Sequence, residues 1–570
     1  MKNTNRQPPK AAAKPQLWHY ALALFAFLFL TFEVYQPALN GPFIFDDAYL
    51  PFTQPEYQNA PLRGWVNNLR PVLMFSYWLN LRLSGLEPYS YHAFNIFFHL
   101  LNGLWVFLLS RRMLERIAQG NPSNLILATF AGAVFLLHPV QTESVAYVAS
   151  RSEVLSVLFF HAGFVLFLTR QQKGLSFPSA LGVLTLFGIA SLTKEHAAVF
   201  PALLLFTDWF WGGYSFAAIR RNWRLYVPAT IVGAGALAFV FRVLRSADTA
   251  GFGMKDLPWH DYFYTQCRAI WVYIRLFFLP VGQNFDYDFA ISRSLLDHGA
   301  IFGLIGLLAL AAAAFVYKER FPLASYGVFV FLILLAPTSS FVPIRDVLVE
   351  RRLYLPFIGL LFVSLEFLSR WKTSRTALIG TLAGVLAVLS FLTYSRNHLF
   401  GDPIALWTDT IERSPNKARP HFQLGFAHYE RQRCDEAVKY YDKAAALEPP
   451  EEKLLIDWAL AYDCLSRPGD ALGKLHQAAA RKETAHIYSL IGMIHGKQGH
   501  REQALEALAK AESLNRRWDM TYAYRGNVYT ASGELDEAEK EFRRALALDP
   551  SNPVATQGLA ALRRMRSGRR

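Results

Sequence analysis

The sequence predicts an all-α protein made of two parts, a polytopic membrane domain followed by an α-solenoid. Up to about residue 396, apolar runs alternate with short basic segments, and the remainder has the composition of a soluble helical protein. The tail also repeats its small and bulky residues at a fixed spacing. Of the 570 residues, 53% are hydrophobic and 18% are charged, whereas a soluble domain carries about 25% charged residues.

The first part contains apolar runs of the length that a bilayer-crossing helix requires, roughly 17–25 residues. We count about eleven candidate spans, several of them short. They lie at 17–36, 89–110, 124–140, 152–169, 178–193, 196–211, 225–244, 298–317, 322–337, 353–369 and 376–395. No small-residue cleavage site follows the first run, so we interpret it as an uncleaved span rather than a signal peptide.

Basic residues between the runs predict the orientation, because cytoplasmic loops are enriched in Lys and Arg. The lysines of the N-terminal tail 1–15 place that end in the cytoplasm. The loops 37–88, 245–297 and 338–352, and everything after residue 396, then lie on the external side. Segment 263–281 is apolar but carries Arg268 and Arg275, which favours an interfacial or re-entrant helix.

The tail contains four segments that align at a period of 33–34 residues, the spacing of tetratricopeptide repeats. Small residues recur at Gly425, Ala459, Gly492 and Gly526, bulky ones at Tyr441, Leu475, Leu508 and Phe542, and alanines flank the bulky positions. We predict a catalytic membrane domain over 16–396, a linker over 397–417 and four repeats over 418–570. Residues 553–566 would form a capping helix.

Composition excludes several classes of function. The net charge of +14 would suggest nucleic-acid binding in a soluble protein, but here the basic residues set membrane orientation, so no nucleic-acid partner is expected. The three cysteines, Cys267, Cys434 and Cys464, form no close-spaced pair and predict neither a zinc site nor a disulfide framework. A bridge between Cys434 and Cys464 is left open.

The first external loop begins with two adjacent carboxylates, Asp46 and Asp47. A neighbouring like charge raises the pKa of a carboxyl group, which suits a general base; a solvated turn or a helix cap is the alternative. Arg70 precedes Pro71 at a predicted helix start. It would pair with a phosphate or with the two aspartates, or reach the lipid headgroups.

The second span carries His92, Asn95, His99 and Asn102 on one face, since they recur at three- and four-residue steps. Such a stripe points to a protein interior or a cavity. The residues either line a substrate pocket or are packed and hydrogen-bonded in the core.

Most remaining charges cluster at the external boundary. They are His138, Glu143, Arg151, Glu153, Lys194, Glu195, Arg268, Arg275, Asp286, Asp288, Arg345, Asp346, Glu350, Arg351 and Arg352, with Tyr354 beside them. Structural pairs scattered through a membrane protein would show no such sidedness. The asymmetry indicates one external site for an anionic, membrane-embedded substrate, and Arg suits phosphate.

No phosphate loop or nucleotide fingerprint is present. If the protein transfers a glycosyl group on the external side, the donor must therefore already be there, carried on a lipid.

The ordered motifs FDD, RP, YHxxNxxxH, HPVxTESVA, SRSE, LTKE, LFFLP, DYD and ERRLYLP, followed by the repeats, resemble the transmembrane and tetratricopeptide-repeat O-mannosyltransferases, which are GT-C glycosyltransferases. The resemblance implies transfer of a sugar from a polyprenyl-phosphate donor, dolichyl-phosphate mannose in eukaryotes, to Ser/Thr hydroxyls of proteins. It also implies an acceptor polypeptide bound in the repeat groove.

The resemblance further implies roles for single residues. Asp46 would be the base and Asp47 its helper. Arg70, Arg268, Arg275 and Arg351 would bind the donor phosphate. The substrate pocket would comprise His92, Asn95, His99, His138, Glu143, Arg151, Lys194, Glu195, Glu350 and Tyr354. Direct attack on the donor would invert the sugar carbon, with neither metal nor cofactor.

Two departures modify this prediction. Gln141 stands where the family tends to have His, and the repeat array is short. We therefore expect a prokaryotic relative with an undecaprenyl-phosphate donor, whose sugar is not fixed as mannose. Two alternatives stay open. One is a GT-C transferase that acts on a glycolipid or glycan acceptor or uses a lipid-pyrophosphate oligosaccharide, and the other is a non-catalytic membrane scaffold.

Overall fold

The computed structural model describes residues 17–233 and 250–567, apart from the side chains of the first turns of helix α1. The predicted tail 1–15 and part of the predicted span 225–244 lie outside the described residues. The described chain is helical throughout, with one isolated β-bridge between Ala250 and Ile344. This confirms the predicted all-α class.

The chain divides into two compact units. The first comprises residues 1–285 and 289–402, and the second comprises 403–570 together with the short segment 286–288. The stretch 397–417, which we predicted as a linker, contains the end of helix α17 and the whole of α18.

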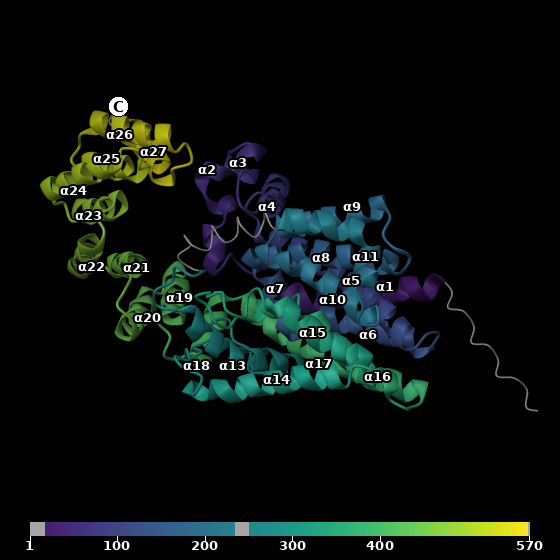
Figure 1. The fold of residues 1–570 in the computed structure, drawn as a ribbon. Coiled ribbons are helices and arrows are strands. Elements are labelled where there is room, and N and C mark those ends of the chain that lie inside the picture. Colours follow the sequence, from purple (N-terminus) through teal and green to yellow (C-terminus); the bar gives the residue numbers. More distant parts are fainter. Residues whose placement is uncertain (1–16, 234–249, 568–570) are drawn as a thin grey trace, which may run out of the picture. The chain divides into compact units, whose positions relative to one another are not determined.

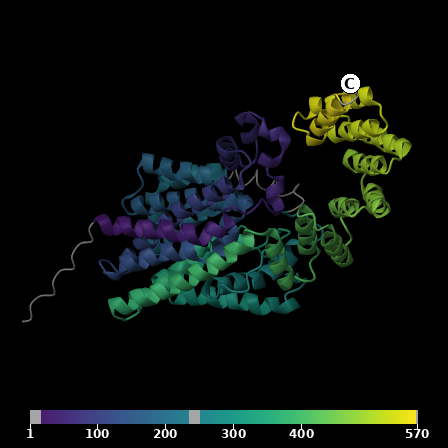
Figure 2. The same ribbon diagram turned by 180° about the vertical axis from the view of Figure 1, so that it is seen from behind.

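The first unit is a bundle of long helices with shorter ones between them (Figures 1 and 2). Its α-helices are α1 (Leu17–Tyr35), α2 (Pro55–Gln58), α3 (Leu62–Val66), α4 (Pro71–Ser84), α5 (Pro88–Ile117), α6 (Ser123–Leu137), α7 (Thr142–Ala146), α8 (Arg151–Arg170), α9 (Phe177–Ser191), α10 (Phe200–Trp211), α11 (Ala217–Arg221), α13 (Trp259–Phe278), α14 (Ala300–Val316), α15 (Pro322–Leu335), α16 (Phe357–Arg370) and α17 (Arg375–Phe400).

Among the described residues, four helical stretches are long and apolar enough to cross a membrane: 88–117, 148–173, 297–316 and 375–400. The bent pair 123–137 and 139–146, which turns by 47°, would make a fifth. Helices α9 and α15 are apolar but shorter. These spans mark the chain as a membrane protein, but the count of about eleven is not confirmed, because several predicted runs form helices too short to cross a bilayer.

Close packing in the bundle depends on glycines at helix crossings, as small residues permit in membrane helices. Gly327 on α15 and Gly359 on α16 face each other: a Cβ atom on Gly359 would lie 2.5 Å from the backbone nitrogen of Phe331 and 2.6 Å from the carbonyl oxygen of Gly327. Gly103 on α5 likewise leaves room for the side chain of Leu136 on α6. The bundle core therefore tolerates little added volume.

The loop between α1 and α5 folds into a small helical layer, α2–α4, near one end of the long helices (Figures 1 and 2). Its core is aromatic, with Phe52, Trp65, Tyr77 and Tyr91 fully or almost fully buried against one another. Phe52 packs against Tyr91 with ring centroids 4.4 Å apart. The loop that carries Asp46 and Asp47 is thus attached to a folded support.

Helix α13 covers most of the segment 263–281 whose topology the sequence left open. Both of its arginines bond backbone carbonyls that follow the helix: Arg268 donates to Ala290 at 2.9 Å and Arg275 to Val281 at 2.8 Å. Among the described helices, α13 is not one of the four long apolar spans.

The second unit is a stack of helix pairs. Its helices are α18 (Pro403–Arg413), α19 (Ala418–Glu430), α20 (Cys434–Leu447), α21 (Glu452–Cys464), α22 (Pro468–Arg481), α23 (Ala485–Lys497), α24 (Arg501–Leu514), α25 (Asp519–Ala531), α26 (Leu535–Leu548) and α27 (Pro553–Ser567).

The four predicted repeats coincide with the pairs α19–α20, α21–α22, α23–α24 and α25–α26, and α27 covers the last pair. In each repeat the small residue of the first helix packs against the bulky residue of the second. A Cβ atom on Gly425 would lie 2.7 Å from the ring of Tyr441, and one on Gly526 would lie 2.6 Å from Phe542. The repeat period in the sequence therefore reflects the close packing of the two helices within each repeat.

A disulfide joins Cys434, at the start of α20, to Cys464, at the end of α21. The sequence left this bridge open because the two residues lie 30 positions apart and only the stacking of adjacent repeats brings them together. The segment 286–288 belongs to the same unit: Asp286 pairs with Lys417 and Arg419, the second through two bonds of 2.7 and 2.5 Å.

The crossing of α15 and α16 provides a test of the packing. Replacing Gly359 by Ala should lower the free energy of unfolding by about 1–3 kcal/mol, because the added methyl group meets backbone atoms that cannot move independently. Gly384→Ala on α17 is the matched control, since nothing lies within 4 Å of its Cβ position. Thermal unfolding of the two variants in detergent gives the comparison, and equal stabilities would contradict this account.

Candidate functional site

The two loop aspartates lie on a short 3₁₀ helix, Phe45–Tyr49, and they point in different directions. Asp47 is fully buried, whereas Asp46 is exposed. Phe45, just before them, has a φ of +50°, a conformation that L-residues adopt rarely and that is often found at functional sites. The backbone is therefore held in a strained turn that presents Asp46 outward.

Asp47 anchors this turn. Its carboxylate accepts the backbone N–H of Ile44 at 3.1 Å and that of Ala149 at 2.7 Å, which ties the loop to the segment before α8. Burial raises the pKa of Asp47 to about 8, although these two N–H groups lower it and Asp46 raises it further. With both oxygens engaged by backbone, Asp47 supports the loop, and Asp46 is the carboxylate that a substrate can reach.

Tyr147 contacts the backbone of Asp46 and was not among the site residues predicted from sequence. The backbone N–H of Asp46 donates to the Tyr147 hydroxyl at 3.0 Å. The Tyr147 ring also packs against Phe285, with centroids 5.4 Å apart, and against Phe45 at 6.5 Å. A tyrosine in an apolar stretch has no distinguishing sequence signal, so only the fold reveals this contact.

Arg351 joins the same group of residues. Its guanidinium lies 5.9 Å from the centroid of the Tyr147 ring and forms an ion pair with Glu143. The other carboxylate oxygen of Glu143 accepts the backbone N–H of Arg351 at 3.2 Å. The structure thus brings together three predicted site residues, Asp46, Glu143 and Arg351, from three separate segments.

A second group of charges surrounds the turn between α9 and α10. Arg70 forms a two-pronged pair with Glu195, both bonds 2.8 Å long, while Lys194 pairs with Glu153 on α8. Although Lys194 and Glu195 are adjacent in sequence, they have different partners. Lys194 has an extended backbone, φ −156° and ψ 138°, so successive side chains point to opposite sides.

The two groups are electrostatically connected. Burial lowers the pKa of Lys194, Glu153 raises it, and both Arg70 and Arg351 lower it further. Arg70 and Arg351 are therefore near enough to the same ammonium group to repel it. The pair Arg70–Glu195 is the more accessible, with 38% and 44% of the side chains exposed, compared with 22% and 2% for Arg351 and Glu143.

Arg151, predicted to line the pocket, is instead a fully buried connection between helices. Its guanidinium donates to Asn95 at 2.9 Å on α5, to Asn80 at 2.8 Å on α4, and to the carbonyl of Tyr91 at 2.9 Å. It lies 4.6 Å from the centroid of the Tyr77 ring. These contacts fix the helical layer α2–α4 to the bundle.

The polar stripe on α5 is also part of the core. His92 contacts the carbonyl of Gly41 at 3.1 Å, and His99 contacts the hydroxyl of Tyr354 at 2.8 Å and the carbonyl of Leu136 at 3.1 Å. Asn95 binds Arg151 and the carbonyl of Val145. Of the two interpretations left open, these contacts correspond to packed and hydrogen-bonded residues.

The remaining predicted residues contact other segments. Arg268 and Arg275 bond the chain between residues 281 and 292. His138 contacts the carbonyl of Phe277 at 3.0 Å, and Glu350 accepts the amide of Gln283 at 2.8 Å and the backbone N–H of Asn284 at 2.6 Å. Within residues 17–233 and 250–567, no cluster of three or more His, Cys, Asp or Glu residues is arranged to hold a metal ion.

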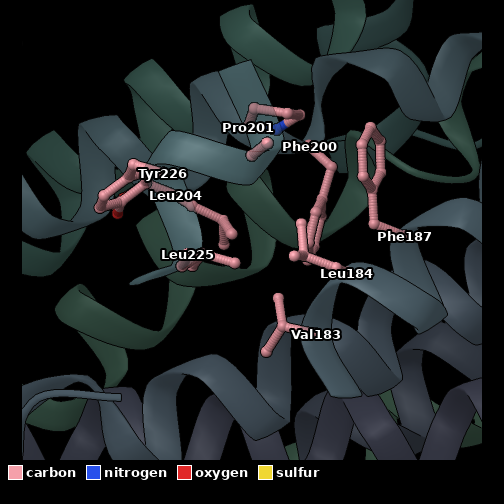
Figure 3. Close-up of a pocket in the computed structure, with 9 residues that line it drawn as sticks. Val183, Leu184, Phe187, Phe200, Pro201, Leu204, Leu225 and Tyr226 are labelled. Carbon is pink, nitrogen blue, oxygen red and sulfur yellow. The ribbon is translucent and has the colours of Figure 1, made fainter. Parts of the chain in front are cut away.

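A small apolar pocket lies between α9 and α10 (Figure 3). It is lined by Val183, Leu184 and Phe187 of α9, by Phe200, Pro201 and Leu204 of α10, and by Leu225, Tyr226 and Ala229. Its α10 wall begins five residues after Glu195.

The buried carboxyl of Asp47 predicts a pH dependence of stability. Its folded-state pKa of about 8 lies above the ordinary value of 3.8, so its contribution to stability is fully present below about pH 4 and is lost as the pH rises through about 8. The unfolding temperature of the wild type, relative to that of Asp47→Asn, should fall from about pH 6 to about pH 9. A constant difference would contradict the assignment.

Comparison with known proteins matches both the repeats and most of the chain. Two tetratricopeptide-repeat family models match residues 485–517 and 520–552. The chain is 25% identical over 449 residues to the protein O-mannosyl-transferase F38B6.6 of Caenorhabditis elegans, which covers 74% of this chain and 62% of that protein. It is 23% and 24% identical to the protein O-mannosyl-transferase TMTC3 of Mus musculus and of Homo sapiens, over 86% of this chain and 58% of each relative.

The chain spans about three fifths of the length of these relatives. The similarity extends through the membrane unit as well as the repeats, since an alignment of 86% of the chain cannot be confined to the repeat tail. Over most of its length, therefore, the chain is similar to protein O-mannosyl-transferases, as its motifs predicted.

Proposed function

We propose that this protein is a membrane glycosyltransferase that transfers a sugar from a polyprenyl-phosphate donor to Ser/Thr hydroxyls of exported proteins. The observation that supports it most strongly is the exposed Asp46 carboxylate on a strained turn, whose backbone N–H bonds the same tyrosine, Tyr147, that the Arg351 guanidinium contacts at 5.9 Å from its ring centroid. Transfer from a phosphate-linked donor requires a reachable base and a cation in the same site.

Arg70 is the best candidate for the donor phosphate. An exposed ion pair stabilises a protein by about 0–1 kcal/mol, so a phosphate can replace Glu195 on the guanidinium with the same two-pronged geometry. Arg351 and Lys194 would add positive charge near the leaving phosphate. Arg268 and Arg275 are weaker candidates, because they donate to backbone carbonyls of the segment 281–292.

Asp46 would act as the general base. The acceptor hydroxyl attacks the anomeric carbon, its proton passes to the Asp46 carboxylate, and the bond between that carbon and the phosphate oxygen breaks. The polyprenyl phosphate leaves with the bonding electron pair. Attack from the side opposite to the leaving group inverts the configuration of the sugar carbon.

Other features are consistent with this scheme. The disulfide Cys434–Cys464 favours an oxidising compartment for the repeats, in agreement with an external or lumenal orientation. We propose that the repeats bind the acceptor polypeptide, as stacked helical repeats often do.

The proposal is tested by the masses of exported proteins in a strain that lacks the gene. Restoring the wild type should return hexose-sized additions, and Asp46→Asn should lower their rate of formation by at least about 10²-fold, because the hydroxyl proton has no acceptor. Glu56→Gln is the matched control, since it removes an exposed carboxylate from the same loop.

Full glycosylation with Asp46→Asn at normal protein levels would contradict a role as base and favour the scaffold alternative. Unchanged protein masses in the deletion strain would show that protein is the wrong acceptor class, and glycolipid analysis would then follow.

A further inference from the structure

We propose that Tyr147 is a positioning residue of this transferase, because its hydroxyl holds the backbone of Asp46 and its ring supports the guanidinium of Arg351. The inference rests on the proposed function and assigns to Tyr147 the alignment of the base with the cation nearest to it. Tyr147 itself would contact neither the sugar nor the phosphate.

Two contacts place Tyr147 between Asp46 and Arg351. The Asp46 N–H donates to its hydroxyl at 3.0 Å, and the Arg351 guanidinium lies 5.9 Å from the centroid of its ring. The side chain is 1% exposed, so it occupies one fixed place. The bond to the hydroxyl acts on the residue that follows Phe45, whose φ of +50° needs support from its surroundings.

The segment that carries Tyr147 also holds Arg351 through a second residue, Glu143. Glu143, four residues earlier, pairs with the Arg351 guanidinium and accepts its backbone N–H. Residues Glu143–Tyr147 therefore hold Arg351 through one residue and Asp46 through another. A shift of this segment would move the base and the cation together, and loss of the hydroxyl alone would release only the base.

The Tyr147 hydroxyl stays protonated, and its oxygen is available to accept the Asp46 N–H. Burial raises the pKa of Tyr147, and the carboxylates of Asp47 and Asp46 raise it further. The oxygen accepts the Asp46 N–H while the hydroxyl keeps its own proton. Because Asp46 is exposed, water can replace the lost acceptor in a Tyr147→Phe variant, so the fold should persist while the turn loses its fixed position.

The activity test compares full-length wild type, Tyr147→Phe and Tyr91→Phe in lipid nanodiscs. The assay uses dolichyl-phosphate mannose and undecaprenyl-phosphate mannose as donors and a Ser/Thr-rich peptide as acceptor. Tyr91 is the matched control: it is also buried, and its hydroxyl donates to the carbonyl of Gly85 at 3.0 Å, outside the site. Thermal unfolding of each variant is measured in parallel.

We expect Tyr147→Phe to lower kcat by about 10- to 100-fold, with KM for the donor changed less than about threefold, because a misplaced base slows chemistry more than binding. Tyr91→Phe should keep kcat within about threefold of the wild type. Equal kcat values for Tyr147→Phe and an active wild type would refute the positioning role alone. A wild type that transfers mannose from neither donor would instead refute the proposed function with this sugar.

A second measurement needs no substrate. Hydrogen–deuterium exchange should show a faster exchange of the Asp46 amide in Tyr147→Phe than in the wild type and in Tyr91→Phe, since the amide loses its acceptor. Unchanged exchange of that amide would overturn the inference, even if the variant lost activity through a general loss of stability.

Discussion

The buried guanidinium of Arg151 is the interaction on which the geometry of the candidate site depends. It is fully buried and bonds neutral oxygens of Asn80, Asn95 and the Tyr91 carbonyl. A buried charge is expensive unless every donor finds a partner, and here the partners come from α4 and α5 while the arginine begins α8. Moving α4 or α5 away from α8 would leave donors of this buried charge without partners, so the relative positions of the three helices are closely specified.

The positions of the site residues follow from that connection. Arg70 precedes α4, and Glu153 lies two residues after Arg151 on α8. The segment just before Arg151 supplies the Ala149 N–H for Asp47 and the hydroxyl of Tyr147 for Asp46. One buried cation thus brings the loop carboxylates, the accessible arginine and the paired lysine to the same end of the bundle.

The two adjacent aspartates show how identical side chains take different roles. Asp47 faces inward, accepts two backbone N–H groups and has a pKa raised by burial, whereas Asp46 faces outward on the strained turn. Neighbouring residues on a short 3₁₀ helix necessarily point in different directions. The inner carboxylate can therefore fix the loop while the outer one remains free for chemistry.

Much of this arrangement was predictable from sequence, and the remainder depended on tertiary contacts. The repeat register was predictable because Gly425 and Tyr441 record a direct contact within one repeat. The positions of the charges between the apolar runs could be read from sequence, because charged residues are rare within spanning helices. Sequence could not show that Lys194 and Glu195 have different partners, because this depends on one extended residue.

Pattern alone also could not separate a cavity from a packed core. His99 and Asn95 lie on one face in either case, and only their partners, Tyr354 and Arg151, show that they connect helices. Tyr147 carries no sequence signal, since its role depends on segments about 100 and 200 residues away meeting at its ring.

In the proposed mechanism, the donor phosphate binds at Arg70 and its sugar faces Asp46. A cryo-electron microscopy structure of the full chain with dolichyl-phosphate mannose tests it most directly. We expect the phosphate within hydrogen-bond distance of Arg70, Glu195 displaced from that guanidinium, and the anomeric carbon on the side of Asp46. A phosphate bound at Arg268 or Arg275, with the Arg70–Glu195 pair intact, would contradict the account.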